Sequence, residues 1–430
     1  MGARDRVQSE KQNQVKKTTI QEFIYLLKFC FHPKKTDEAM EKRLRSPQFD
    51  WEPVLLLARS HNLLALIFEL ASEISDTFVT SEVYQRYAPS VIGSIAGQMR
   101  RTELLFDIYG KLQEQGVFPL ILKGIICRKL YGRYADCRPS ADEDFLITPK
   151  EFEQTKGILL DNFYEIEDKK ECEQILDEIQ EVTFCHPSGL SIELHLNPIG
   201  QESMIKRTFN DYFKDVTKHY LECDIQGHRI RTMTYTDHYL FLFFHTLKHF
   251  CEGGVGIRQV LDLLLFREKY AAEMDWEYIG KALQETGGYP FYCDCMEIGK
   301  RYLGFEVPNG KYYRPKELLE DILYSGAFGN DTKEKLLASR MTSMAVISGA
   351  DSSLLRRIMI FLFPPKESFM MFRPELMTKP YLLPLEWIRR WIRFIKKYLL
   401  RNPQKEMVIK SSLHRGKRRI RLLQKYGILR

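Results

Sequence analysis

The apolar residues of this chain change their spacing twice, and the changes limit the folds that the chain can adopt. Residues 18–115 carry apolar side chains at helical spacing, residues 116–235 carry short alternating or continuous apolar runs, and helical spacing returns after Thr236. Side chains on one face repeat every 3.6 residues in a helix and every two in a strand. The pattern predicts an α+β protein, with a small mixed β-sheet flanked by N-terminal and C-terminal helical regions.

The same changes predict five segments. They are a flexible N-terminus (1–17), an N-terminal helical region (18–115), the sheet core (116–235), a C-terminal helical domain (236–380), and a basic amphipathic helix with a tail (381–430). A chain of 430 residues with 44% hydrophobic residues has room for two or three domains.

Inside the core, short apolar runs and turn residues predict the order of elements. Strands are expected at 117–122 and 142–147, with helices at 125–131 and 151–160, and hairpins at 182–196 and 221–233. Thr236 is the expected cap of the first helix after the core. Further helices are expected near 237–251, 257–270, 276–287, 289–303, 315–325, 332–345 and 352–363.

Positive charge is concentrated at the C-terminal end. Residues 386–430 hold fifteen Lys or Arg and two Glu; since the whole chain has a net charge of +7, the rest is mildly acidic. Residues 385–399 form an amphipathic pattern with two tryptophans, which suits either a membrane surface or packing on the body. The tail at 404–430 is expected to be solvated or to bind nucleic acid.

Two features indicate a cytoplasmic protein, with a peripheral position at the membrane as the alternative. The nine cysteines include no Cys-x-x-Cys pair, which is typical of thiols in a reducing compartment. The N-terminus is polar and has no signal-peptide pattern, and no apolar run is long enough to cross a bilayer.

The segment that carries chemistry is Arg138-Pro-Ser-Ala-Asp-Glu-Asp-Phe-Leu-Ile147. On a strand, Asp142 and Asp144 project from the same face, and Glu143 points the other way. Two neighbouring carboxylates repel each other unless a cation lies between them, and Mg²⁺ prefers carboxylate and phosphate oxygens. We therefore expect a divalent metal site here.

Glu193 is the expected third carboxylate of a two-metal site. In 190–196, Ser191, Glu193 and His195 share a polar face, while Ile192, Leu194 and Leu196 share an apolar one. Upstream, Lys123-Gly124 ends a strand and opens a helix, where free backbone N–H groups are expected to bind phosphate. Each signal is common alone, so the prediction rests on their order.

That order resembles the nucleotidyltransferase superfamily that includes DNA polymerase beta, and more closely a large bacterial nucleotidyltransferase family. The matching elements are Leu122-Lys123-Gly124, Arg138 with Asp142 and Asp144, and Ile192-Glu193-Leu194-His195. The resemblance, from about residue 50 to 384, implies transfer of NMP from an NTP, with Mg²⁺ or Mn²⁺ held by Asp142, Asp144 and Glu193. It also implies phosphate contacts by Lys123, Gly124 and Arg138.

Two positions depart from the family pattern. Ile125 stands where a Gly or Ser usually follows Gly124, and Glu143 stands where an apolar residue is usual. Both favour the alternative of a catalytically inactive nucleotide-binding module. A further alternative is a membrane or nucleic-acid adaptor that acts through residues 385–430. The acceptor and the oligomeric state do not follow from the sequence.

Further side chains are expected near the substrate. His245 and His249 lie one helical turn apart, and Arg258 follows a glycine-containing loop. A zinc site is disfavoured because no Glu follows the first histidine. His195, His245, His249 and Arg258 are therefore candidates for substrate contact, with a packing or capping role as the alternative for the histidines. An ion pair is expected between Arg258 and Asp262.

Overall fold

A computed structural model gives the fold. It describes residues 3–34, 37–168, 173, 181–199, 208–308, 313–326, 342, 362–364, 366–369, 373, 376, 379–394 and 403–429. The chain divides into two compact units, the first made of Met1–Thr246 with Gly256–Leu319 and the second of Leu247–Val255 with Glu320–Arg430. The five segments expected from the sequence stay a prediction.

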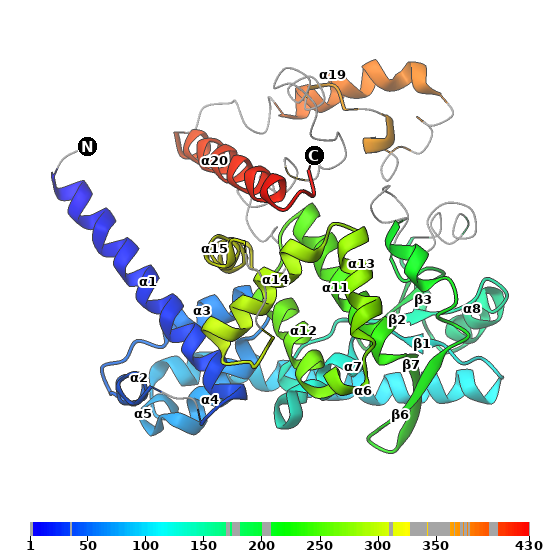
Figure 1. Ribbon diagram of the computed structural model, residues 1–430, viewed down its shortest axis with the longest axis horizontal. Coiled ribbons are helices and arrows are strands. Elements are labelled where there is room, and N and C mark those ends of the chain that lie inside the picture. The colour runs from blue at the N-terminus through cyan, green and yellow to red at the C-terminus, as the bar shows by residue number, and fades with distance from the viewer. Residues whose placement is uncertain are drawn as a thin grey trace. The chain divides into compact units, whose positions relative to one another are not determined.

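The N-terminal part of the first unit is helical, as predicted. Its helices are α1 (Ala3–Phe31), α2 (Glu38–Leu44), α3 (Glu52–Ser60), α4 (Leu64–Ile74), α5 (Asp76–Val79) and α6 (Glu82–Glu114). The Ser81 hydroxyl caps α6 by accepting the N–H of Tyr84 at 3.1 Å. Figure 1 shows α6 running from the N-terminal helices to the sheet, and it contacts both α4 and α8.

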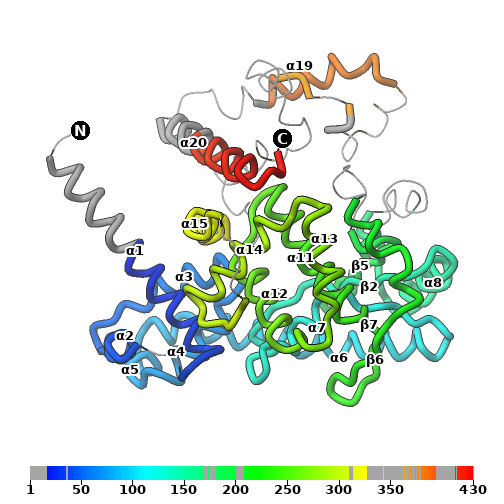
Figure 2. The backbone as a smooth tube through the Cα atoms, viewed as in Figure 1, coloured from blue at the N-terminus to red at the C-terminus, as the bar shows by residue number. Residues whose placement is uncertain are grey.

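A seven-stranded mixed sheet lies at the other end of this unit (Figures 1 and 2). The strands are β1 (Leu120–Ile121), β2 (Asp142–Leu146), β3 (Glu165–Ile166), β4 (Glu181–Cys185), β5 (Ser191–His195), β6 (Tyr220–Ile225) and β7 (His228–Met233). Their order is β3-β4-β5-β2-β1-β7-β6, with β2–β5 and β1–β7 parallel and the other pairs antiparallel. The mixed sheet and both predicted hairpins are confirmed.

Local differences from the predicted elements have backbone causes. The helix expected at 125–131 is a short α7 (Ile125–Arg128) that continues as a 3₁₀ segment, Lys129–Cys137. Gly132, with φ of 57°, interrupts helical geometry within that segment. The first strand is only two residues long, and α8 spans Phe152–Asp161 as expected.

The helices after the sheet follow the predicted positions closely. They are α11 (Tyr235–Glu252), α12 (Ile257–Tyr270), α13 (Trp276–Glu285), α14 (Tyr289–Ile298) with a π-helical turn (Gly299–Leu303), and α15 (Pro315–Ser325). The helices expected near 332–345 and 352–363 lie outside the described residues. The expected cap was wrong by two positions. The Thr234 hydroxyl accepts the N–H of Asp237, whereas that of Thr236 accepts the N–H of Asp275.

One face of the central strands is apolar. Phe145 on β2 faces Leu194 on β5, which in turn faces Val182 on β4, and the Ile192–Phe184 pair lies beside them. All five side chains are fully buried. This confirms the predicted apolar face of Ile192 and Leu194 and leaves the opposite face of the same strands for polar residues.

In the second unit, the C-terminal helix packs rather than forming a solvated tail. In α20 (Pro403–Lys425), the buried Arg419 donates to Asp321, to Ser325 Oγ at 3.2 Å and to the carbonyl of Phe250. Leu422 and Leu423 are buried as well. This part of the 404–430 segment is therefore a folded helix, because its apolar side and one arginine are removed from water.

In helix α19 (Leu383–Phe394), a charged side chain is buried and several apolar side chains are exposed. Its Glu386 is 3% exposed and is contacted by Arg373 and Arg389, whereas Leu385, Ile388 and Ile392 are 51%, 59% and 48% exposed. The expected amphipathic helix is present over this range. In the part of the chain that the structure describes, no helix has the length and hydrophobicity of a membrane span.

Candidate active site

The polar face of the central strands gathers the carboxylates singled out in the sequence. Strands β2 and β5 are parallel, with Asp144 opposite Glu193, Asp142 opposite Ser191 and Leu146 opposite His195. Opposed residues on neighbouring strands point to the same side of the sheet. The register therefore places Asp142, Asp144, Glu193 and His195 on one face.

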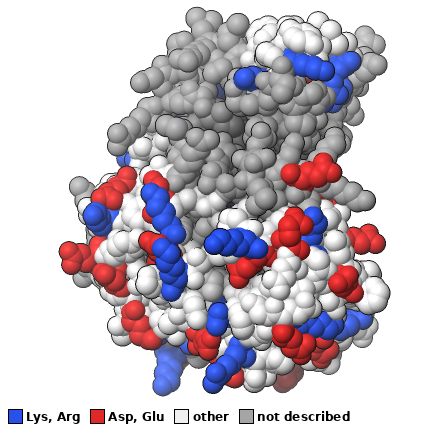
Figure 3. All heavy atoms as spheres, turned by 90° about the vertical axis from the view of Figure 1, so that its right-hand side faces the viewer, with Lys and Arg blue, Asp and Glu red and all other residues white. Residues whose placement is uncertain are grey.

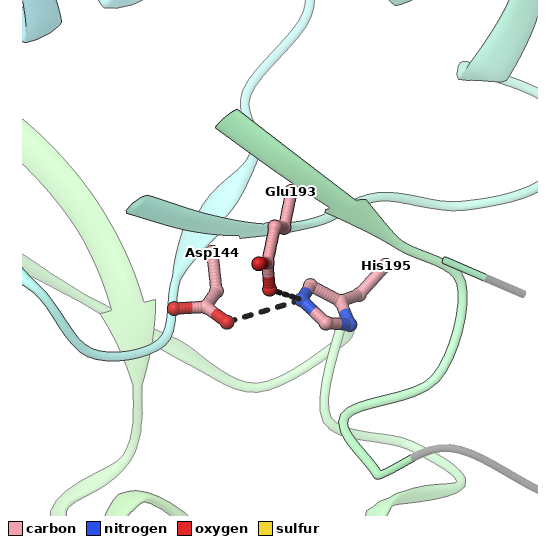
Figure 4. Close-up of side chains that lie close together, drawn as sticks. All are labelled: Asp144, Glu193 and His195. Carbon is pink, nitrogen blue, oxygen red and sulfur yellow. Dashed lines mark hydrogen bonds and ion pairs between the residues drawn. The ribbon is translucent and has the colours of Figure 1, made fainter. Parts of the chain in front are cut away.

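Three of these side chains converge on one point, as Figure 4 shows. Nε2 of His195 lies 3.1 Å from Oδ1 of Asp144 and 3.5 Å from Oε2 of Glu193. One ligand atom from each residue lies within 4.8 Å of the others. Asp144 is 2% exposed, and its second oxygen, Oδ2, has no hydrogen-bond partner among the residues that the structure describes. A buried oxygen without a partner requires a physical explanation, and a bound cation would supply one.

Lys123 lies beside these carboxylates. Its Nζ is 2.9 Å from Oδ1 of Asp144, 3.5 Å from Oδ2 of Asp142 and 3.3 Å from Nε2 of His245. The lysine expected to bind phosphate thus neutralises part of the carboxylate charge. His245, predicted as a substrate contact, is placed at the same point, whereas His249 belongs to the second unit and its role stays a prediction.

The pKa values follow from these contacts. Burial alone would lower the pKa of Lys123, but Asp144, Asp142 and Glu193 outweigh it and raise that pKa. Burial would raise the pKa of Asp144, but Lys123 and His195 hold it below its usual range. Against burial, hydrogen bonds to Asp144 and Glu193 raise the pKa of His195 to about 10. Burial raises the pKa of Glu193. The surrounding carboxylates therefore stabilise the protonated forms of Lys123 and His195.

The backbone N–H of Ile125 is not free, contrary to the prediction. It donates to Oε2 of Glu143 at 2.9 Å, so the two positions that depart from the family pattern contact each other. Gly124 has φ of 57°, and a Cβ there would collide with the Glu143 carboxylate. Burial raises the pKa of Glu143 to about 7, opposed by Arg128. Glu143 thus holds the Gly124 turn from the side of the sheet opposite Asp142 and Asp144.

Arg138 is buried in an ion pair. Its Nε and Nη2 donate to the two oxygens of Asp262 at 2.8 and 2.6 Å, and Tyr131 donates to the same carboxylate at 2.8 Å. The expected Arg258–Asp262 pair is wrong, because Asp262 is engaged by Arg138 and Arg258 donates to the carbonyl of Pro139 at 2.6 Å. Arg138 therefore links the sheet to α12 in this structure, and a phosphate contact by Arg138 stays a prediction.

The segment that leads into β2 is hydrogen-bonded at three consecutive residues, Arg138, Pro139 and Ser140. Asp262 binds Arg138, Arg258 binds the carbonyl of Pro139, and α6 holds Ser140. On α6, Gln98 accepts the N–H of Ser140 at 2.8 Å and Arg101 donates to its carbonyl at 3.1 Å. These contacts fix the start of the strand that carries Asp142 and Asp144, as a preorganised site requires.

One residue at the site was not found from the sequence. Glu181 lies opposite His195 in the β4–β5 pair, and its Oε2 is 3.6 Å from Nδ1 of that histidine. The predicted hairpin began at residue 182, and extending it by one residue at the end away from its turn would have indicated Glu181. His195 was expected only as a substrate contact, although its place on the polar face with Glu193 was predicted correctly.

The sheet, with two aspartates on one strand and a glutamate opposite on a parallel strand, fits the nucleotidyltransferase class. The family comparison agrees. A family model described as uncharacterised nucleotidyltransferase matches residues 47–304, more than half of the 430-residue chain, and the chain therefore belongs to this family. Neither a search of curated proteins nor a search of solved structures gave a match.

The donor set fits a divalent ion. Asp144, Glu193 and His195 offer two carboxylate oxygens and one ring nitrogen, and Oδ2 of Asp144 is buried without a partner. Asp142 is not a member of this three-residue cluster, but it shares Lys123 with Asp144 and its side chain is 37% exposed. It therefore lies at the more exposed edge of the cluster.

Proposed function

We propose that this chain transfers NMP from an NTP to an acceptor such as a small molecule, a sugar- or lipid-linked intermediate, or a protein side chain. The observation that carries the proposal is the buried Asp144–Glu193–His195 cluster with its unpartnered oxygen, beside Lys123 and Asp142. In this reaction the acceptor oxygen attacks the α-phosphorus and loses its proton. The bond from that phosphorus to the bridging oxygen breaks, and pyrophosphate leaves.

The residues have separate tasks in this proposal. Asp142, Asp144 and Glu193 hold the divalent ion, Mg²⁺ or Mn²⁺, which when bound neutralises the triphosphate and lowers the pKa of the attacking hydroxyl. Lys123, which contacts both aspartates in this structure, would contact the phosphates when a cation occupies the carboxylates. Arg258, whose Nε has no hydrogen-bond partner and whose charge interacts with Asp142, is a further phosphate candidate.

Calorimetric titration of each NTP with Mg²⁺ tests the site. We expect metal-dependent binding by the wild type and at least a hundredfold loss in the double variant Asp142→Asn/Asp144→Asn, on the scale of removing charge-stabilising groups. Asp107→Asn is a matched control, because Asp107 is an exposed carboxylate on α6. Absence of binding by the wild type would contradict the proposal.

A label on the α-phosphate separates an enzyme from an inactive binding module. The inactive alternative is favoured by the Glu143–Ile125 contact, which engages a backbone N–H expected to hold phosphate. We expect the label to move from NTP into an acceptor in cell extract, with release of pyrophosphate. Binding without transfer in any extract would support the inactive module instead.

A second candidate function, as an adaptor at an anionic membrane surface, rests on α19. Leu385, Ile388 and Ile392 are exposed next to arginines. On the face of the sheet-bearing unit in Figure 3, by contrast, red and blue side chains are mixed. Sedimentation with vesicles containing phosphatidylserine tests this candidate. We expect Ile388→Glu/Ile392→Glu to reduce sedimentation about tenfold, and no sedimentation of the wild type would contradict it.

A further inference from the structure

We propose that His195, on releasing its Nε2 proton to solvent, is a metal ligand through that nitrogen and gives the site a preference for a first-row transition ion, such as Mn²⁺, over Mg²⁺. The inference deepens the proposed function, on which it rests, by naming the class of ion that the nucleotidyltransferase site takes. Imidazole nitrogen is a good ligand for transition ions, whereas Mg²⁺ prefers oxygen ligands and water.

The spacing of the three donor atoms supports the assignment. For an ion about 2.1 Å from each ligand, neighbouring ligand atoms lie about 3.0 Å apart in an octahedron and about 3.4 Å apart in a tetrahedron. Nε2 of His195 is 3.1 Å from Oδ1 of Asp144 and 3.5 Å from Oε2 of Glu193. Nε2 of His195 thus already lies at coordination-sphere distances from both carboxylate oxygens, and the three donor atoms lie within 4.8 Å of one another.

The other nitrogen of the ring gives an independent observation. Metal-binding histidines usually donate their second ring N–H to a carboxylate, which fixes the orientation of the ring. Nδ1 of His195 lies 3.6 Å from Oε2 of Glu181, on the strand paired with β5. Nε2 therefore faces the two ligand carboxylates, and Nδ1 faces a third that is placed to orient the ring.

The buried and unpartnered Oδ2 of Asp144 completes the case. His195 and Lys123 both contact Oδ1 of that carboxylate, so the contacts within the protein leave the second oxygen unsatisfied. A cation that binds both oxygens of Asp144 satisfies Oδ2 as well as Oδ1, which a purely structural His195–Asp144 hydrogen bond does not. The geometry is therefore that of a site with a ligand still to be bound.

Electron paramagnetic resonance of Mn²⁺ without nucleotide tests the inference independently of NTP binding. We expect nitrogen hyperfine coupling on bound Mn²⁺ in the wild type and its loss in His195→Gln. Competition by Mg²⁺ gives the selectivity, and we expect His195→Gln to lower the Mn²⁺-to-Mg²⁺ affinity ratio about tenfold. Glu181→Gln is expected to weaken Mn²⁺ binding about tenfold and to keep the nitrogen coupling.

Two further proteins complete the experiment. His228→Gln removes an exposed imidazole on β7, which is separated from β5 by two strands, β2 and β1, and should behave as the wild type does. Lys123→Met removes the ammonium that competes for the carboxylates, so the same measurements in this background remain informative if the wild type binds Mn²⁺ weakly. Mn²⁺ bound without nitrogen coupling, an unchanged affinity ratio in His195→Gln, or no Mn²⁺ binding in either background would overturn the inference. Nitrogen coupling without NTP binding would support the inference and contradict only the proposed function.

Discussion

Two groups of charged side chains lie within a few residues of each other along the chain, and their charges are balanced differently. In the first, Arg138 meets Asp262 as one positive and one negative group, and Tyr131 adds a hydrogen bond. In the second, four carboxylates (Asp142, Asp144, Glu181 and Glu193) face two cationic side chains (Lys123 and His195). The first group is saturated, whereas the second has excess negative charge and an unpartnered oxygen.

The difference separates a structural group from a functional one. A balanced pair with both carboxylate oxygens bound has nothing further to gain from a ligand, and breaking it leaves a buried charge without a partner. A cluster with excess negative charge gains free energy when a cation binds, and loses little when one carboxylate is neutralised. Stability measurements should therefore respond to the first group, and binding measurements to the second.

The largest expected effect is on folding. We expect Asp262→Ala to reduce the free energy of unfolding by about 3–5 kcal/mol, because the buried Arg138 loses its counter-charge. Urea unfolding measures this. Asp107→Ala is the matched control, since the Lys111–Asp107 pair is exposed and is expected to contribute less than about 0.5 kcal/mol. Equal effects of the two substitutions would remove the distinction between the groups.

The second effect is on the rate of NMP transfer. We expect Asp144→Asn to reduce NMP transfer on the order of a hundred- to a thousandfold, because one charge-stabilising ligand is lost. The same variant should change the free energy of unfolding by no more than about 1 kcal/mol, because three carboxylates remain for Lys123 and His195. A loss of stability as large as that of Asp262→Ala would show that Asp144 is chiefly structural.

Lys123→Met should separate metal binding from nucleotide binding. Without nucleotide, Mn²⁺ or Mg²⁺ affinity is expected to rise about tenfold, because the ammonium 2.9 Å from Asp144 no longer competes. NTP affinity is expected to fall about tenfold, because a phosphate contact is lost. Calorimetry measures both. If the two affinities fall together, Lys123 does not compete with the metal ion.

How far the sequence predicts these groups depends on the distance between partners along the chain. Alternation along 190–196 correctly separated Ser191, Glu193 and His195 from Ile192 and Leu194, because strand periodicity is local. Pairing of Arg138 with Asp262, 124 positions apart, leaves no local signal, and helical spacing suggested Arg258 instead. Likewise, no local pattern indicates a partner for Glu143, which contacts the Ile125 N–H only after β2 packs against the Gly124 turn.

The smallest expected effect concerns two buried histidines with opposite pKa directions. The carboxylates around His195 raise its pKa, whereas burial lowers the pKa of His238 to about 3, with Thr232 and aromatic rings around it. The pKa of His238 is depressed in the folded state. Its contribution to the free energy of unfolding is therefore fully present above about pH 6.5 and is lost as the pH falls toward 3.

Unfolding by urea at pH 7.5 and at pH 5.0 measures this contribution. Between pH 7.5 and pH 5.0, the free energy of unfolding of the wild type is expected to fall by up to about 2 kcal/mol because of His238. The reason is that this histidine binds a proton in the unfolded chain and stays neutral in the folded one. His238→Asn retains a donor near the Thr232 hydroxyl but cannot be protonated. Its free energy of unfolding should therefore fall correspondingly less between the two pH values. An identical pH dependence in the two proteins would contradict the assigned state of His238.

The most direct measurement is the thermal stability of the wild type and Asp144→Asn, each with and without Mn²⁺ and a nonhydrolysable NTP. A ligand that binds only the folded state raises its stability by about 2.7 kcal/mol at a hundred times its dissociation constant. We expect this gain in the wild type and its absence in Asp144→Asn, while the two proteins without ligand melt at nearly the same temperature. A gain of equal size in both proteins, or in neither, would contradict the assignment of the Asp144 cluster as the metal and nucleotide site.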